Sequence, residues 1–140
     1  RTEDVENLAH GLIFVGDEDL GECLAEHQHD DGSKEMLGVV RVWNDPANIR
    51  TEFSIIIRDD LQGLGIGSLL MKKMIDYCTS IGTLEMIGKI MVDNHPMRAL
   101  MKHLGFRCRY NMEEQVIDAV LRLNEPDSEW QRHRLESLPD

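Results

Sequence analysis

The stretch from Thr51 to Ser68 constrains the fold of this chain more than any other segment. It begins with alternating polar and apolar residues, which is typical of a strand with one buried face. One face of this strand carries Glu52, Ser54, Ile56 and Arg58, and the other carries Phe53, Ile55 and Ile57. A polar turn follows, then three glycines at every second position and a helical pattern that starts at Gly67. A glycine loop between a strand and a helix presents backbone N–H groups to an anion.

Length and charge limit the class of protein. A chain of 140 residues most simply forms one domain with its own core. Its formal net charge of −11 argues against nucleic-acid binding, because contacts to phosphates need a basic surface. An acidic surface fits a positively charged partner or substrate, such as an amine, although it often serves solubility alone.

Cysteine usage and hydropathy indicate the compartment. Cys23, Cys78 and Cys108 are widely spaced and form no Cys-x-x-Cys pair, which is typical of a reducing compartment and not of a disulfide framework. No apolar run approaches the length of a membrane span or a signal peptide. We therefore expect a cytoplasmic protein without a membrane partner. Because the first residue is Arg1 and not Met, we also expect the chain to be part of a longer protein.

Hydrophobic periodicity predicts a mixed sheet with helices on its faces. Strands are predicted at 22–28, 35–43, 51–57, 84–92, 106–111 and 115–123, and helices at 2–9, 67–81, 97–104 and 130–135. The apolar run 12–15 is too short to classify, and fits either a strand or a segment that packs under the sheet. Hairpins at both ends and a strand–helix–strand unit between them imply both antiparallel and parallel pairing. We expect one domain over residues 1–124 and a polar tail over 125–140.

Two histidines, His27 and His29, alternate onto one face of a predicted hairpin strand, and Asp30 and Asp31 follow them. Imidazole and carboxylate groups are common metal ligands. Beside a hairpin turn, however, solvated polar side chains are the more ordinary interpretation, and no further ligand has a defined spacing. The sequence therefore predicts no metal site.

Three anion-binding motifs compete for the glycine loop. A phosphate-binding loop of the P-loop type needs Lys and Ser/Thr directly after its last glycine, whereas Gly67 is followed by Ser68 and Leu69. The dinucleotide fingerprint Gly-x-Gly-x-x-Gly/Ala fails at Ser68 and again at Leu70. A third pattern, Gln/Arg-x-x-Gly-x-Gly/Ala, is matched by residues 62–67. Its small residues let the backbone approach a pyrophosphate without a lysine or a metal, although an ordinary strand-to-helix turn explains the loop alone equally well.

A second motif lies thirty residues further on. Residues 94–106 read Asn-x-x-Met-Arg-x-Leu-Met-x-x-Leu-Gly-Phe, which is a helix closed by Leu-Gly-Phe. Together with the glycine loop, this segment resembles the GCN5-related N-acetyltransferases (GNAT), which transfer an acyl group from acyl-coenzyme A to an amine. The resemblance covers residues 22–123. It implies an α/β (α+β) fold with a mixed, mostly antiparallel central sheet, flanking helices, and a coenzyme-binding strand that splays from its neighbour.

The resemblance also implies how acetyl-CoA binds as co-substrate, with no metal. Backbone groups of Ile55, Ile56 and Ile57 would pair with the pantetheine arm, and Asn94 would lie beside the coenzyme. The pyrophosphate would be held by the loop and the first helical turn, which comprise Gln62, Gly63, Leu64, Gly65, Ile66, Gly67 and Ser68.

Residues 51–67 are similar in finer detail to the acetyltransferase domain of bacterial protein-lysine acetyltransferases. The matching features are the Glu on the coenzyme strand, the Arg-Asp-Asp turn, and Met97 after Asn94. Members of this subgroup carry an acyl-CoA synthetase-like domain upstream and modify acyl-CoA synthetases, so the resemblance implies a protein-lysine substrate of that kind. A small-molecule amine acetyltransferase and a non-catalytic acyl-CoA-sensing domain remain alternatives.

Amine chemistry singles out Glu52 as the candidate catalytic residue. A lysine near its reference pKa of about 10.4 is almost fully protonated at neutral pH, so a general base assists its attack on a thioester. Glu52 lies three residues before the predicted coenzyme contacts, and the resemblance points to the same residue. The family often protonates the leaving thiolate with a tyrosine, but Met101 occupies that position here and no general acid is assigned. Cys78 lies on an apolar helix face, which favours a core position over covalent catalysis.

Overall fold

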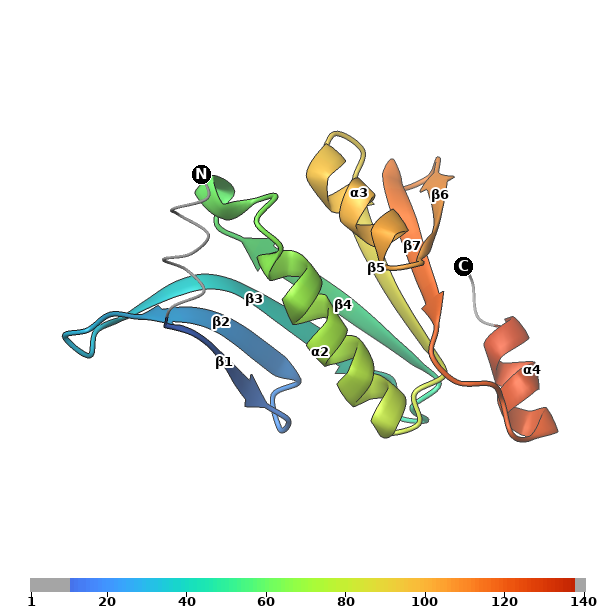
Figure 1. Cartoon of the computed structure of the whole chain (residues 1–140). Coiled ribbons are helices and arrows are strands. Elements are labelled where there is room, and N and C mark those ends of the chain that lie inside the picture. Colours follow the sequence, from blue (N-terminus) through green and yellow to red (C-terminus); the bar gives the residue numbers. More distant parts are fainter. Residues whose placement is uncertain (1–10, 138–140) are drawn as a thin grey trace. The chain divides into compact units, whose positions relative to one another are not determined.

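The structure, a computed structural model, describes residues 11–137. Its strands are β1 (Leu12–Asp17), β2 (Glu22–Gln28), β3 (Lys34–Asn44), β4 (Arg50–Ile57), β5 (Glu85–Met91), β6 (Arg107–Asn111) and β7 (Val116–Arg122). Its helices are α2 (Ile66–Ser80), α3 (His95–His103) and α4 (Glu129–Ser137), with a short 3-10 helix η1 (Asp59–Leu61). Hydrogen bonding connects the strands in the order β1-β2-β3-β4-β5-β7-β6 (Figure 1). The β4–β5 pair is parallel, and the β1–β2, β2–β3, β5–β7 and β6–β7 pairs are antiparallel.

The predicted strands and helices that fall within the described residues are all present, with ends that move by one or two residues. The apolar run 12–15, which the sequence left unclassified, belongs to β1 and pairs with β2. The helix predicted over residues 2–9 lies outside the described residues. No helix within residues 11–137 is long and apolar enough to cross a membrane.

The chain divides into two compact units, which are described separately. The first comprises residues up to 41 together with 55–74, and the second comprises 42–54 together with 75–140. The domain boundary expected at residue 124 stays a prediction.

The first unit is built from β1, β2, most of β3, the end of β4, η1 and the N-terminal part of α2. The apolar face predicted for this helix is buried, with Leu70 and Met71 fully inaccessible to solvent. Gly38 on β3 makes this packing possible, because a Cβ atom there would lie 2.7 Å from Cδ1 of Ile57 and 3.2 Å from Cδ1 of Leu70. Close contact between helix and strand therefore requires glycine at this position.

The second unit centres on β5, which lies between β4 and β7 in the sheet. Phe53 and Phe106 meet edge to face, with ring centroids 5.5 Å apart. Gly88 on β5 leaves room for the Phe53 ring, because an added Cβ would lie 2.3 Å from Cζ of Phe53. Helix α4 also packs within this unit, where its Leu135 joins Ile49 and Leu84 in a buried apolar cluster.

Candidate functional site

The glycine loop in the first unit has an open geometry. Gly63 and Gly65 adopt positive φ angles of 86° and 90°, a region that side chains of L-residues rarely adopt. A Cβ atom on either glycine would meet nothing within 4 Å. The glycines are therefore needed for the backbone conformation and not for packing, and the space above the loop is free for a ligand.

Helix α2 begins directly after the loop, at Ile66. The first intrahelical bond runs from the Leu69 N–H to the Gly65 carbonyl, at 3.1 Å. The N–H groups of the first helical turn have no acceptor within the helix, and the positive end of the helix dipole lies at the same place. Backbone donors at Ile66, Gly67 and Ser68 thus suit a phosphate group, and the binding of a pyrophosphate by this segment stays a prediction.

Strand β4 changes its pairing along its length. Its register with β5 runs from Arg50↔Glu85 to Glu52↔Ile87 and ends there, although β4 continues to Ile57. The backbone of the remaining residues is therefore outside the β4–β5 ladder, which is the arrangement expected for a splayed strand. The predicted contacts of Ile55, Ile56 and Ile57 with pantetheine need such backbone groups, and they stay a prediction.

Glu52 lies on β4 within the second unit, and its side chain is exposed. The alternation predicted for this strand is confirmed, since Ser54 and Ile56 are also exposed whereas Phe53 and Ile57 are buried. Glu52 therefore lies on the solvent-accessible face of the strand and is available to an acceptor amine.

Lys89 on β5 is a neighbour of Glu52 that the sequence did not single out. It donates a hydrogen bond to Glu114. This bond raises the pKa of Lys89, and the negative charges of Asp118 and Glu52 raise it further. The surface around Glu52 therefore carries a lysine held in its charged form. The β4–β5 ladder pairs Glu52 with Ile87, and Lys89 lies two residues further along β5, on the same face as Ile87. The sequence alone does not reveal this neighbour, because it depends on how the two strands pair.

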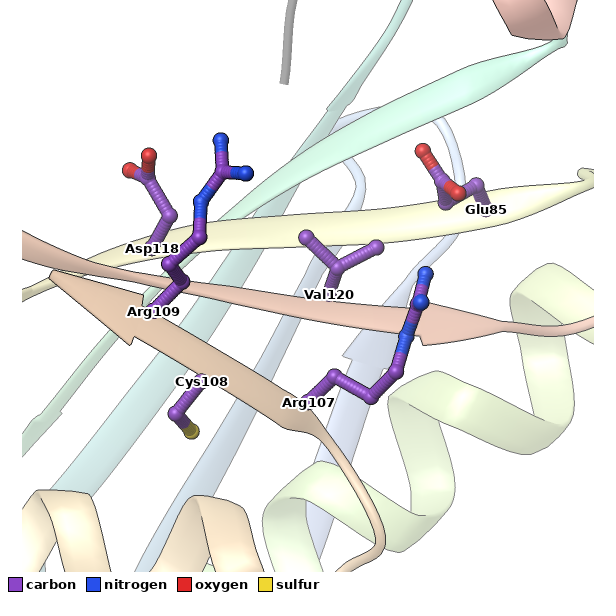
Figure 2. A pocket seen from close by; sticks show the side chains of 6 residues that line it. All are labelled: Glu85, Arg107, Cys108, Arg109, Asp118 and Val120. Atoms are coloured by element: carbon purple, nitrogen blue, oxygen red, sulfur yellow. The ribbon is translucent and has the colours of Figure 1, made fainter. Parts of the chain in front are cut away.

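A cavity of about 180 Å³ opens on β5, β6 and β7 in the same unit. Figure 2 shows that Arg107 and Arg109 point to one side of β6, whereas Cys108 points to the other. Asp118 on β7 lies opposite Lys89 in the register and accepts a hydrogen bond from Asn111 at 3.1 Å. The lining of the cavity combines acidic and basic groups: Glu85, Arg107, Cys108, Arg109, Asp118 and Val120. Because both charge signs line the cavity, its charges do not define one class of ligand.

Asn94 caps helix α3. Its Oδ1 accepts a hydrogen bond from the Met97 N–H at 3.2 Å, and Pro96 stands in the first turn, as expected of a helix start. The structure thus gives Asn94 a structural role, and its contact with the coenzyme stays a prediction. Met101, which replaces the expected tyrosine, is fully buried and therefore belongs to the core.

The cysteines are not placed for covalent catalysis. Cys78 is fully buried, and burial raises its pKa to about 11. The pKa of Cys108 is also raised by burial. Neutral thiols are poor nucleophiles. The burial of Cys78 confirms the core position that was predicted for it.

The comparisons with known proteins identify the class. Residues 3–106 match the Acetyltransferase (GNAT) family, which is well over half of the chain. This chain therefore belongs to the GNAT acetyltransferase family, and the predicted family and fold class are confirmed. The family consists of acyltransferases that use acetyl-CoA as co-substrate, and nothing in these likenesses indicates a metal requirement.

Two curated relatives and one solved structure illustrate the likeness. The chain is 33% identical over 78 residues to acetyltransferase PA5475 of Pseudomonas aeruginosa, covering 56% of this chain and 42% of that protein. It is 37% identical over 54 residues to acetyltransferase Pat of Mycolicibacterium smegmatis, covering 39% of this chain and 16% of that protein. The chain thus spans less than half the length of either relative. The structure of yncA from Salmonella typhimurium with its cofactor acetyl-CoA shares the fold, with a TM-score of 0.60 and 20% identity over 79% of this chain and 70% of that one.

Proposed function

We propose that this chain is an N-acetyltransferase domain that transfers the acetyl group of acetyl-CoA to the side chain of a protein lysine. The observation that carries the proposal is the segment from β4 through the glycine loop into α2, which lies within the family match and combines an open loop with free space above it. The net charge of −11 favours a cationic acceptor. The likeness to acetyltransferase Pat supports the protein-lysine subgroup, and an acyl-CoA synthetase is the expected kind of substrate.

In the proposed mechanism, bound acetyl-CoA supplies the activated acyl group and the protein supplies position and a base. The segment from Gln62 to Ser68 holds the pyrophosphate, chiefly through the N–H groups of the first helical turn, because those of Gln62 and Leu64 donate to the carbonyls of Asp59 and Leu61. Backbone groups of Ile55 to Ile57 orient the pantetheine arm, and Asn94 lies beside the coenzyme. Glu52 accepts the proton of the incoming ammonium group, directly or through water, so that a neutral amine attacks the thioester carbonyl. The C–S bond then breaks, coenzyme A leaves as its thiolate, and the second proton of the amine ends on that thiolate, directly or through solvent. Transfer is direct, since buried Cys78 cannot carry the acetyl group. The three unpaired, widely spaced cysteines favour action in the cytoplasm.

The coenzyme site is tested by calorimetry with acetyl-CoA. Gly65→Ala forces a side chain into a positive-φ position of the loop, and Gly82→Ala does the same at the end of α2, where φ is 85° and the space is equally open. Both variants should lose similar stability from backbone strain. Only Gly65→Ala should lose coenzyme affinity, by about tenfold, which corresponds to about 1.4 kcal/mol. Equal affinity in the two variants would remove the loop from the coenzyme site.

The catalytic role is tested by Glu52→Gln, with Ser54→Ala as the control on the same exposed face. Loss of a general base should slow transfer by about 10²–10⁴-fold while the Kd for acetyl-CoA stays unchanged. Ser54→Ala should retain transfer. The acceptors in this assay are an acyl-CoA synthetase with an accessible lysine and a set of polyamines. Acetylation of the polyamines alone would indicate a small-molecule enzyme. Binding of acetyl-CoA with no acetylation of either indicates a sensing domain, and unchanged transfer by Glu52→Gln excludes Glu52 as the base.

A further inference from the structure

The buried face of β2 runs towards two histidines, of which His27 lies in the strand and His29 lies one residue beyond its end at Gln28. Cys23 and Ala25 on this face are buried, at 7% and 0% exposure. Side chains two residues apart lie on the same face of a strand, so His27 and His29 continue the row towards the β2–β3 turn. The two rings lie together, with centroids 4.5 Å apart. The buried side chains of this row are thus followed by two imidazole rings.

The strand register adds a carboxylate to this pair. Glu35 on β3 lies directly opposite His27, and its Oε1 is 3.0 Å from Nε2 of His29. Asp31, which follows the histidines in the sequence, is not in this group; its Oδ1 accepts from the N–H and the hydroxyl of Ser33 at 2.9 and 2.6 Å within the turn. The third group is therefore a cross-strand glutamate, which spacing along one strand does not reveal.

The separations suit a single small cation. One candidate ligand atom from each of His27, His29 and Glu35 lies within 4.8 Å of the other two. Nitrogen and oxygen ligands about 2.1 Å from a tetrahedral zinc ion are about 3.4 Å from each other. Small side-chain rotations therefore bring all three atoms to coordinating distance, and the fourth position of the ion remains open.

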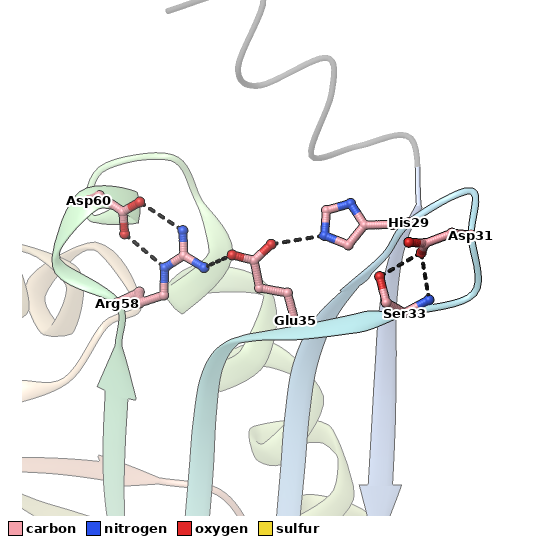
Figure 3. Close-up of polar contacts among 6 residues, drawn as sticks. All are labelled: His29, Asp31, Ser33, Glu35, Arg58 and Asp60. Atoms are coloured by element: carbon pink, nitrogen blue, oxygen red, sulfur yellow. Dashed lines mark hydrogen bonds and ion pairs between the residues drawn. The ribbon is translucent and has the colours of Figure 1, made fainter.

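Arg58 supports the glutamate from outside, as Figure 3 shows. It donates to Oε2 of Glu35, so that Oε1 points to His29. Arg58 is itself fixed by Asp60 through two hydrogen bonds of 2.9 and 2.8 Å. Hydrogen-bonded partners of this kind orient metal ligands in characterised sites.

We propose that His27, His29 and Glu35 form a binding site for a divalent transition-metal ion of the zinc class. A set of two imidazoles and one carboxylate suits such ions better than it suits Mg²⁺ or Ca²⁺. The side chains of His29 and Glu35 are 43% and 42% exposed, so an ion reaches them from solvent. The proposed metal site takes no part in acetyl transfer, because the proposed mechanism needs no metal. It stabilises the Arg58-Asp59-Asp60 turn that precedes the glycine loop.

The primary test is zinc binding to the full chain, stripped of metal with a chelator and free of any histidine tag. Isothermal titration with Zn²⁺ should give one site per chain, and Co²⁺ should produce the intense visible absorption of a four-coordinate site. His29→Asn and Glu35→Gln each remove a ligand on an exposed side chain, so both variants should fold, as circular dichroism checks. Each should weaken Zn²⁺ binding by about 100-fold.

Two matched controls separate this site from other histidines and acids. His133→Asn changes an exposed histidine on α4, and Asp31→Asn changes the turn aspartate; both should bind Zn²⁺ as the unmodified chain does. Arg58→Gln leaves all three ligands in place and should weaken binding by about tenfold through Glu35 alone. Absence of one-to-one binding, or equal affinity in His29→Asn and His133→Asn, would overturn the proposal.

Discussion

The two halves of strand β4 differ in what they contact and in what they expose. The first half, Arg50–Phe53, carries the ladder to β5, a salt bridge between Arg50 and Glu85, and two buried side chains. The second half, Ser54–Ile57, continues beyond that ladder and exposes 62% of Ile56. The first half of the strand therefore contributes to stability, whereas the backbone of the second half lies outside the ladder to β5. Glu52 is the last residue of that ladder.

The largest expected effect separates two glutamates of this region. Glu85 is 5% exposed and binds Arg50 through hydrogen bonds of 2.8 and 2.6 Å. Glu85→Gln should lower the free energy of unfolding by about 3–5 kcal/mol, because it leaves a buried arginine without its counter-charge. Glu52→Gln is the matched control and should change it by less than about 0.5 kcal/mol. Urea unfolding measures both, and equal losses would show that the ion pair between Arg50 and Glu85 contributes no more to stability than the exposed carboxylate of Glu52.

The next effect concerns the glycine beside Phe53. In Gly88→Ala, the added Cβ lies 2.3 Å from Cζ of Phe53, so the ring or the strand must move. We expect a loss of about 1–3 kcal/mol in the free energy of unfolding, as in other overpacked cores. Phe53→Leu in the same chain should recover part of that loss, which a double-mutant cycle quantifies. If the two losses are additive, with no coupling between the positions, the destabilisation by Gly88→Ala does not come from contact with Phe53.

A buried hydroxyl provides a smaller effect in the first half. Thr51 is fully buried, and its Oγ1 donates to Oδ1 of Asn44 at 2.8 Å. Thr51→Val keeps the shape but leaves that acceptor without its donor, which should cost about 1 kcal/mol. Ser54→Ala, on the exposed face, should cost less than about 0.5 kcal/mol. Thermal unfolding compares the two, and a smaller shift for Thr51→Val would contradict the assignment of that hydrogen bond.

The smallest effect is expected at Ile56, the exposed isoleucine in the second half of the strand. Ile56→Ala should change the free energy of unfolding by less than about 0.5 kcal/mol, and it should leave acetyl-CoA affinity unchanged, because the proposed contact uses backbone groups. Its neighbour Ile57 is 8% exposed, and Ile57→Ala should cost about 2–4 kcal/mol. Calorimetry and urea unfolding on both variants check this, and lost affinity in Ile56→Ala would show that the side chain itself binds coenzyme.

Local patterns predicted most of the fold. The alternation in β4 and the helical period of α2 reflect burial of one face, which the chain encodes residue by residue. Positive φ at Gly63 and Gly65 follows from glycine itself. The apolar run 12–15 could not be classified, because a short apolar segment fits a strand or a segment packed under the sheet until a partner strand pairs with it.

Long-range pairing decided what the sequence could not. The sequence by itself determined the glycine loop, the Asn94 helix start and the choice of Glu52, since each depends on residue types at fixed local spacing. Only the tertiary structure decided that Lys89 neighbours Glu52 and that Glu35, in place of Asp31, joins the two histidines. The physical reason is strand register, because hydrogen bonds between strands set which distant residues lie opposite one another.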